Sequence, residues 1–346
     1  MSLDFFTCHN GKRALDYPPQ PELEPVTDTE EELDEKVDLR YEAGDAPWQG
    51  LPPEVPSGFV PITWPERPQR FVDGKDRGEI VATLRSPQGY PIPVRLSQIG
   101  AAVLREQRGH CRRIDEAVER VVTLIGDPFA WHELEGLAAA LQARGLRLLL
   151  ARLPKTDDPR ALQDFEVMRK ATQNRSNDEM AVLEESVVGR DVKIPTLVDG
   201  PLEKRSGRCN QSAPLIGVIK TQRRSYLNAQ ALETLYQLEM GRRTPAFLIK
   251  KKFPVVSFYL RLAGGMPSWG LVRVEVPQVF FEQVQRRQFS YIHQLAHTLY
   301  EYRCRQESYG RAPVSLHPIV RVEQSLGALF CPMNRLINNF YRIAHL

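Results

Sequence analysis

Short apolar runs bounded by Gly or Pro alternate along this sequence with longer stretches of helical periodicity. The apolar runs predict strands over residues 70–74, 79–85, 91–96, 146–153, 193–198, 215–220, 246–250, 255–261 and 270–275. Helical spacing of apolar residues predicts helices over residues 112–124, 131–144, 159–189, 228–240 and 277–303, and from Pro318 onward. Strands and helices mixed in this order favour an α/β fold, with a mixed central sheet flanked by helices.

Residues 17–68 are rich in Pro and acidic residues, a composition that rarely packs a core. We therefore expect an extended N-terminal arm over residues 1–68, with a short helix near 29–41, ahead of a folded body over residues 69–346. We expect the arm to hold little regular structure of its own and to pack along a protein surface, its own body's or a partner's, rather than hang free. Its apolar anchors would be Leu39, Tyr41, Trp48, Leu51, Val55, Phe59 and Trp64.

The charge of the chain is unevenly distributed. Residues 21–50 hold eleven Asp and Glu against Lys36 and Arg40, a net charge of −9, whereas the whole chain carries +3. The rest of the chain is therefore +3 − (−9) = +12. A basic body beside a separate acidic segment suits a protein that meets a polyanion. The alternative is a solubilising acidic tail beside an ordinary mixed surface.

Several common classes of protein are not supported. No apolar stretch approaches the roughly 18–20 residues of a membrane span, and the N-terminus lacks signal-peptide character, so we expect a cytoplasmic protein. The five cysteines are far apart without a CxxC pair, which argues against a disulfide framework or a zinc knuckle. His293 and His297 have the spacing of zinc ligands, but Gln294 stands where the catalytic glutamate of that motif would be. No phosphate-binding loop of the GxxxxGK[ST] type is present.

Two Asp-Gly pairs, each after an apolar strand, are the main candidates for chemistry. They are Asp73 in FVDGKDR and Asp199 in LVDGPLEK. Active sites of α/β sheets gather at the carboxyl ends of strands, where carboxylates from separate strands can converge on Mg²⁺ or Mn²⁺. The alternative is that each Asp-Gly pair simply forms a turn.

A third carboxylate lies on the long helix before Asp199. Met180, Leu183 and Val187 are spaced as an apolar stripe, and Glu184 borders that stripe while Glu185 is angled more toward solvent. A carboxylate at the rim of a buried face can reach a metal. The alternative is that its carboxylate simply reaches past the stripe to solvent.

At these residues the sequence resembles the NurA nucleases, which work with the HerA-type hexameric ATPase. The resemblance rests on five blocks in the same order as in the family, between about residues 69 and 330. They are RFVDGKDR, PTLVDGPLEK, PLIGVIKTQ, VSFYLRL and WGLVRVEVP. It implies an RNase H-like core, a homodimer and cleavage of DNA with Mn²⁺, Mg²⁺ being an alternative cofactor.

The resemblance also implies site residues. Asp73, Asp199 and Glu184 match the metal ligands, with Glu179 and Glu185 as alternatives for the helical glutamate. Lys220 matches the basic residue of the following strand, and the lysine run 250–252 is a second candidate to hold the phosphate backbone. The family has a histidine seven residues after a Pro in the C-terminal helix. Counting from Pro318 reaches Ser325, which leaves Glu323 and His317 as substitutes.

The expected function is therefore a divalent-metal-dependent deoxyribonuclease that acts on single-stranded DNA or DNA ends. Two ions about 4 Å apart would activate water and stabilise the leaving oxygen. A HerA-type ATPase would supply the translocation, either in resection of broken DNA or in phage defence. The alternative is a catalytically weak, RNase H-like adaptor that binds DNA or the ATPase ring.

Overall fold

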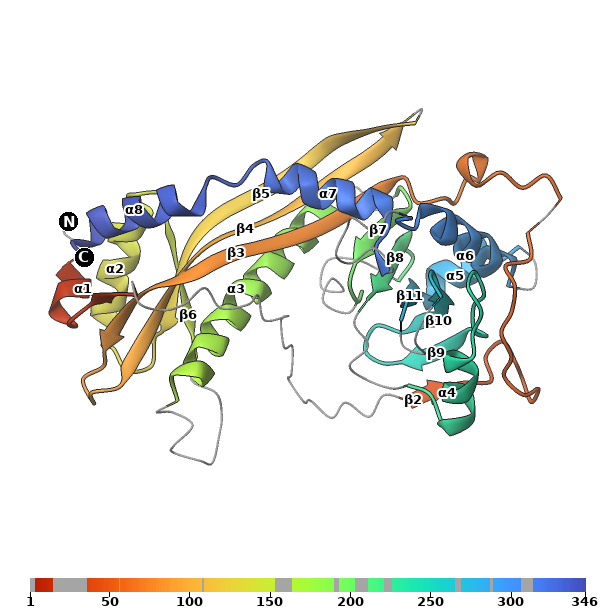
Figure 1. Cartoon of the computed structure of the whole chain (residues 1–346), viewed down its shortest axis with the longest axis horizontal. Coiled ribbons are helices and arrows are strands. Elements are labelled where there is room, and N and C mark those ends of the chain that lie inside the picture. Colours follow the sequence, from red (N-terminus) through yellow and green to blue (C-terminus); the bar gives the residue numbers. More distant parts are fainter. Residues whose placement is uncertain are drawn as a thin grey trace.

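The computed structural model describes residues 4–14, 36–55, 57–107, 109–152, 164–189, 193–202, 211–220, 226–264, 269–286, 289–305 and 314–346 (Figure 1). The helices are α1 (Asp4–Cys8), α2 (Trp131–Gln142), α3 (Phe165–Val188), α4 (Ala229–Tyr236), α5 (Gln278–Val284), α6 (Ser290–Tyr302), α7 (His317–Gly327) and α8 (Met333–Ala344), with a short 3-10 helix η1 (Pro61–Thr63). The strands are β1 (Lys12–Arg13), β2 (Lys36–Asp38), β3 (Arg70–Arg85), β4 (Pro91–Gln107), β5 (His110–Ile125), β6 (Arg147–Ala151), β7 (Thr196–Asp199), β8 (Leu215–Ile219), β9 (Phe247–Lys250), β10 (Val255–Arg261) and β11 (Leu271–Pro277).

The strands of the described residues form one mixed sheet in the order β2-β9-β10-β11-β8-β7-β3-β4-β5-β6, with β1 added beside β3. The pairs β3–β7, β7–β8 and β5–β6 are parallel, and the other pairs are antiparallel. Helices flank this sheet, with α3 and α7 on opposite faces of its centre (Figure 1). The predicted mixed α/β architecture with a large central sheet is confirmed.

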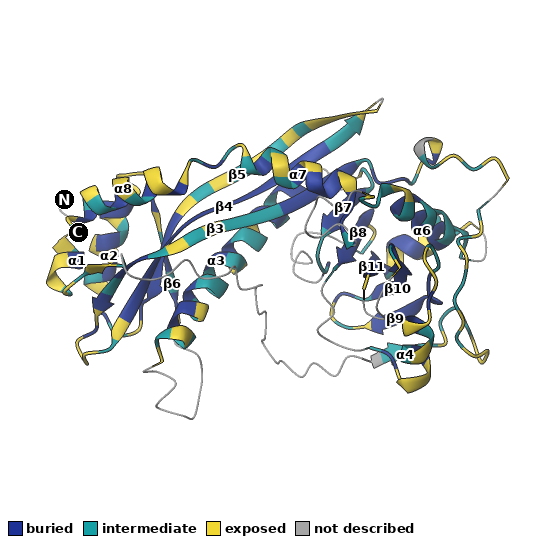
Figure 2. Cartoon of the chain, in the orientation of Figure 1, coloured by how far each residue is buried: buried dark blue, intermediate teal, exposed yellow. Residues whose placement is uncertain are grey.

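Three long strands join two ends of the molecule. β3, β4 and β5 have 16, 17 and 16 residues, which corresponds to about 55 Å of extended chain. At one end β3 pairs with β7, and the short strands β8, β11, β10 and β9 follow beyond it in the sheet. At the other end they carry α1, α2 and α8, which enclose a separate apolar cluster that includes Phe6, Leu141 and Phe340 (Figure 2).

The helix predicted over residues 112–124 is wrong, because this segment is the strand β5. Its side chains alternate between exposed and half-buried along most of the strand, a period of two. Ile114, Val118 and Val121 are β-branched and suit a pleated surface, and β4 offers a partner along nearly the whole length. The helix predicted over residues 277–303 is divided into α5 and α6, with Phe289 between them in a left-handed conformation at φ 51°.

Two apolar clusters pack on the opposite faces of the sheet near β7. One includes Phe71, Leu326 and Tyr291, with side chains from α5, α6 and α7. The other includes Val72 and Leu183, with side chains from α3 and α4. Successive residues of a strand point to opposite faces, so the alternation at Phe71 and Val72 places one side chain in each cluster. The central strands are therefore covered on both faces (Figure 2).

The described part of the N-terminal arm packs on the body of its own chain. Residues 36–38 form β2, antiparallel to β9, instead of the predicted helix, and residues 15–35 lie outside the described part. The aromatic anchors Tyr41, Trp48, Phe59 and Trp64 all contact body residues or the apolar clusters. No helix among the described residues is both long and apolar enough to cross a membrane.

Candidate active site

Asp73 and Asp199 lie side by side on the parallel strands β3 and β7. Val72 is the register partner of Val198, so the two aspartates occupy the next rung of the ladder. The Asp73 side chain is buried, with 8% of the residue exposed. The expectation that Asp73 lies at the end of its strand is wrong, because β3 continues through Gly74 to Arg85. Asp199 does end its strand, and Gly200 follows at φ 101°.

Glu184, on α3, packs against the backbone of Gly74, and its charge acts on Asp73. It is 4% exposed, and a Cβ on Gly74 would lie 2.7 Å from its Oε1. Glu179 is engaged elsewhere, since it accepts from Arg147 and pairs with Arg175 at 2.9 Å. Burial opposes ionisation of Glu179, but these two arginines outweigh it and hold its pKa below its usual value. Of the two buried helix glutamates, Glu184 is therefore the one beside the aspartates.

Lys220, directly after β8, supplies positive charge to the cluster. Its Nζ lies 2.7 Å from Oδ2 of Asp199. Burial lowers the pKa of the Lys220 ammonium, but the charges of Asp199 and Asp73 raise it more, so the group stays protonated.

The C-terminal helix α7 contributes Glu323. Its Oε1 lies 3.3 Å from Nζ of Lys75, and its charge acts on Asp73. His317 is exposed at the first residue of α7, six residues earlier, which is about 9 Å along the helix axis. Ser325 instead accepts a hydrogen bond from Nη1 of Arg113 at 3.2 Å. Of the two predicted substitutes for the family's histidine, the structure brings only Glu323 to the aspartates.

Negative charge exceeds positive charge around Asp73. Its pKa is raised well above the usual value, first by burial, then by the charges of Asp199, Glu184 and Glu323, with Lys220 acting in the opposite direction. Oxygen ligands from carboxylates are what Mg²⁺ and Mn²⁺ prefer, and the excess negative charge favours a cation. The chemistry of these carboxylates therefore suits such an ion. As the side chains stand, no three His, Cys, Asp or Glu of the described residues form a group that could hold one.

In metal-free protein, we expect Asp73→Asn to unfold at a higher temperature than the wild type at neutral pH. A folded-state pKa above the unfolded value means that Asp73 contributes stability below the unfolded pKa and loses it as the pH rises through the folded pKa. The amide of the variant would stay neutral throughout. Thermal unfolding with a chelator, from about pH 4 to 8, measures this. Equal unfolding temperatures at neutral pH would contradict the charge excess.

Arg70 is a functional candidate that the sequence analysis missed. It is 1% exposed, and its guanidinium donates to the carbonyl of Val187 at 3.2 Å and to Oγ1 of Thr196 at 3.4 Å. It thereby joins β3, α3 and β7, the three elements that carry Asp73, Glu184 and Asp199. The detectable signal was an arginine inside an apolar strand, three residues before Asp73.

Within the lysine run 250–252, which was a candidate to hold the phosphate backbone, Lys250 and Lys252 are exposed but Lys251 is not. The Lys251 side chain is buried, with its Nζ 4.0 Å from Glu275. Glu275 accepts a hydrogen bond from the backbone of Leu202 at 3.0 Å, so this pair anchors the segment that follows Asp199. His293 lies against Arg243 and accepts from the backbone of Glu54, which agrees with an ordinary helix histidine.

No protein-family model matches the sequence, and no curated protein matches it. Among solved structures, the chain is similar to the crystal structure of the NurA nuclease from Sulfolobus solfataricus. The two share 14% sequence identity over 79% of this chain and 84% of that chain, with a TM-score of 0.41. Membership of the NurA family stays a prediction from the sequence blocks.

Proposed function

We propose that this chain is a divalent-metal-dependent deoxyribonuclease with an RNase H-like core. The observation that carries the proposal is the cluster of Asp73, Asp199, Glu184 and Glu323 with Lys220, drawn from β3, β7, α3, α7 and the end of β8. Burying several carboxylates together costs free energy unless a cation neutralises them. A structural role gives no reason to bring these groups together from five elements.

Each residue has a role in this proposal. Asp73, Asp199 and Glu184 would hold Mn²⁺ or Mg²⁺, and Glu323 would add a carboxylate from α7. A bound ion would lower the pKa of water and polarise the phosphodiester. Lys220 would hold Asp199 in place or contact the phosphate. The +12 charge outside residues 21–50 suits a polyanionic substrate.

The biological setting is proposed from the family resemblance of the sequence blocks. The chain would act in the cytoplasm as a homodimer, on single-stranded DNA or DNA ends, with a HerA-type ATPase that moves the DNA. Resection of broken DNA and defence against phage are both compatible with this. A weakly catalytic adaptor of the ATPase ring is the second candidate, favoured by Lys220, whose ammonium already neutralises Asp199.

The test is a cleavage assay on the purified chain with end-labelled single-stranded and duplex DNA. Reactions contain Mn²⁺, Mg²⁺ or a chelator, each with and without a HerA-type ATPase. We expect cleavage with a divalent ion and none with the chelator. No cleavage under any of these conditions, together with retained binding to DNA or the ATPase, would favour the adaptor.

We expect Gly74→Ala to lower cleavage about a hundredfold, because the added Cβ displaces the Glu184 carboxylate, and misplacing a catalytic group by about 1 Å costs this much. The matched control is Gly136→Ala, where a Cβ meets nothing within 4 Å. Cleavage rates at saturating metal compare the two variants. If Gly74→Ala cuts DNA as fast as Gly136→Ala, Glu184 does not act at this position.

A further inference from the structure

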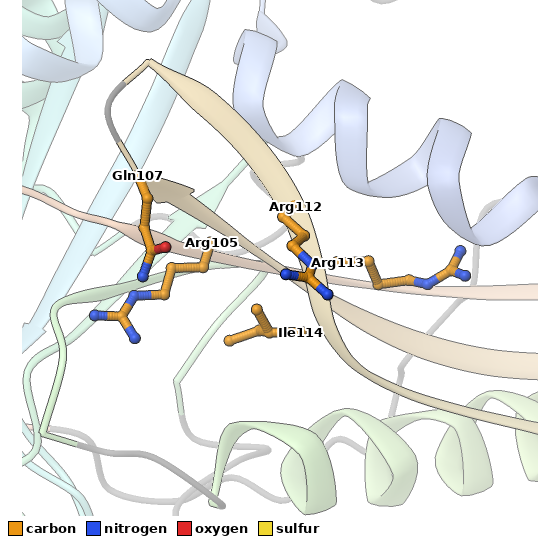
Figure 3. A pocket seen from close by; sticks show the side chains of 5 residues that line it. All are labelled: Arg105, Gln107, Arg112, Arg113 and Ile114. Carbon is orange, nitrogen blue, oxygen red and sulfur yellow. The ribbon is translucent and has the colours of Figure 1, made fainter.

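A basic hollow lies near the tip of the hairpin formed by β4 and β5. Its volume is about 350 Å³, and its lining residues are Arg105, Gln107, Arg112, Arg113 and Ile114. Figure 3 shows the ends of Arg105, Gln107 and Arg112 on the same side of the hairpin, with the guanidinium of Arg113 directed away from them. None of these residues belongs to the carboxylate cluster.

Arg105 and Arg112 face each other across the hairpin without a compensating acid. They are direct register partners, so their side chains leave the same face of the sheet, and like charges in this arrangement are destabilising. Within the described parts of the chain, neither side chain forms a hydrogen bond or an ion pair with another residue, and Nε of Arg105 is buried without a partner. An anion between them would remove the repulsion.

Two acids close to these arginines, Glu106 and Glu116, are already paired. Glu106 binds Arg67 at 2.7 Å, and its position next to Arg105 puts it on the other face of the strand. Glu116 pairs with Arg113, and Nη1 of Arg113 also donates to Oγ of Ser325 on α7. The hollow therefore keeps the positive charge of Arg105 and Arg112.

A β-bulge adds an apolar side chain to this hollow. Val103 pairs with Asp115 and Leu104 pairs with Arg113, so Ile114 is the extra residue of β5. Bulges of this kind re-aim side chains and are common beside active sites. Ile114 is 46% exposed, which leaves an apolar surface beside two cations. That combination suits a ligand with both phosphate and sugar or base surfaces.

The hollow lies on the α3 side of the sheet, as Glu184 does. Arg105 is the register partner of Arg70, which donates to α3 from that side. Asp73 is opposite Ala102, three residues along β4 from Arg105. Three residues of strand span about 10 Å, and because three is an odd number, the Asp73 side chain points to the face of the sheet opposite to the hollow.

We propose that this hollow binds the phosphate backbone of a nucleic-acid strand, on the face of the sheet opposite to the Asp73 side chain. Arg105 and Arg112 contact the phosphate, and Ile114 packs against a sugar or base. This inference rests on the proposed nuclease function, because that function makes a DNA strand the expected ligand.

The test measures binding of a labelled single-stranded oligonucleotide by fluorescence anisotropy, with a chelator present so that nothing is cut. The wild type is compared with Arg112→Ala, with Arg105→Ala/Arg112→Ala and with the control Arg120→Ala, an exposed arginine on the same strand β5. We expect the double variant to bind at least about tenfold more weakly at low salt. Its slope of log affinity against log salt should fall by about 1.4, because each lost phosphate contact contributes about 0.7. If the double variant does not fold, the same binding measurement is made with Arg112→Ala alone.

Cleavage measured in parallel separates this inference from the proposed function. If the arginine variants bind DNA more weakly but the wild type never cuts DNA, the hollow is supported as a binding site and the nuclease function is rejected. A different result would reject only the binding site. If the wild type cuts DNA and both arginine variants keep its affinity and its salt slope, the hollow does not bind DNA and the proposed nuclease function stands. If the variants keep wild-type DNA affinity but lose binding to a poly-glutamate peptide, the hollow takes an acidic protein segment and the proposal is wrong.

Discussion

Asp73→Ala will lower the rate of DNA cleavage by several orders of magnitude, because it removes a ligand of the ion that activates water and polarises the phosphate. Asp73 is also the group on which the other charges act: Asp199, Glu184, Glu323 and Lys220 all shift its pKa. Its loss therefore changes the electrostatics of the whole cluster. The measurement is the single-turnover rate with end-labelled DNA at saturating Mn²⁺.

The control for this prediction is Asp45→Ala, which removes an exposed carboxylate from the N-terminal arm. Asp73→Asn is the second variant, because its amide keeps the size of the carboxylate. Circular dichroism and thermal unfolding of each variant establish that the fold is retained. If a folded Asp73→Ala variant cuts DNA at the rate of Asp45→Ala, Asp73 is not a ligand.

Glu42→Ala will lower the free energy of unfolding by about 3–5 kcal/mol, the usual cost of leaving a buried ion without its partner. Arg243 is fully buried, and Glu42 is 9% exposed. Glu42 accepts from both terminal nitrogens of Arg243, at 2.7 and 2.6 Å, and from the backbone N–H of Ala246. Removal of its carboxylate leaves a cation and an N–H group unpaired in the interior.

The matched control is again Asp45→Ala, which breaks a pair with Arg40 in the same arm. The side chains of that pair are 78% and 89% exposed, so its loss should cost at most about 1 kcal/mol. Urea unfolding followed by tryptophan fluorescence compares the two variants. If both variants lose a similar amount of unfolding free energy, the arm does not contribute to stability through the Glu42–Arg243 pair.

Most helices and strands were predictable from the sequence, because the spacing of their apolar residues and the Gly or Pro residues at their ends indicated the same element. β7, β8, β10 and β11 are apolar runs between Gly or Pro residues, and all four were anticipated within a few residues. The β5 segment was misread as a helix because its apolar residues fit both periods. Only its long-range pairing with β4 decides between them, and local spacing does not reveal such pairing.

The candidate site was predictable in part, for a similar reason. Asp199 follows an apolar run and does end β7, whereas Asp73 lies inside a strand whose length depends on β4. Helical spacing favoured Glu184 over Glu185 from the apolar stripe alone. The importance of Gly74 and Arg70 could not be read from spacing, because both act through contacts with α3, more than 100 residues away along the chain.

The strand order also bears on the solubility of the protein. β2 is the outermost strand beside β9, whose sequence Phe247-Leu248-Ile249-Lys250 is mostly apolar and contains no proline. An uncovered strand of this kind is a template for pairing with other polypeptides, and proteins protect such strands with short, charged or irregular segments. Here the three residues of β2, which belong to the arm, cover the edge of β9. Proteolysis that releases them would therefore convert a covered sheet edge into a nucleus for aggregation.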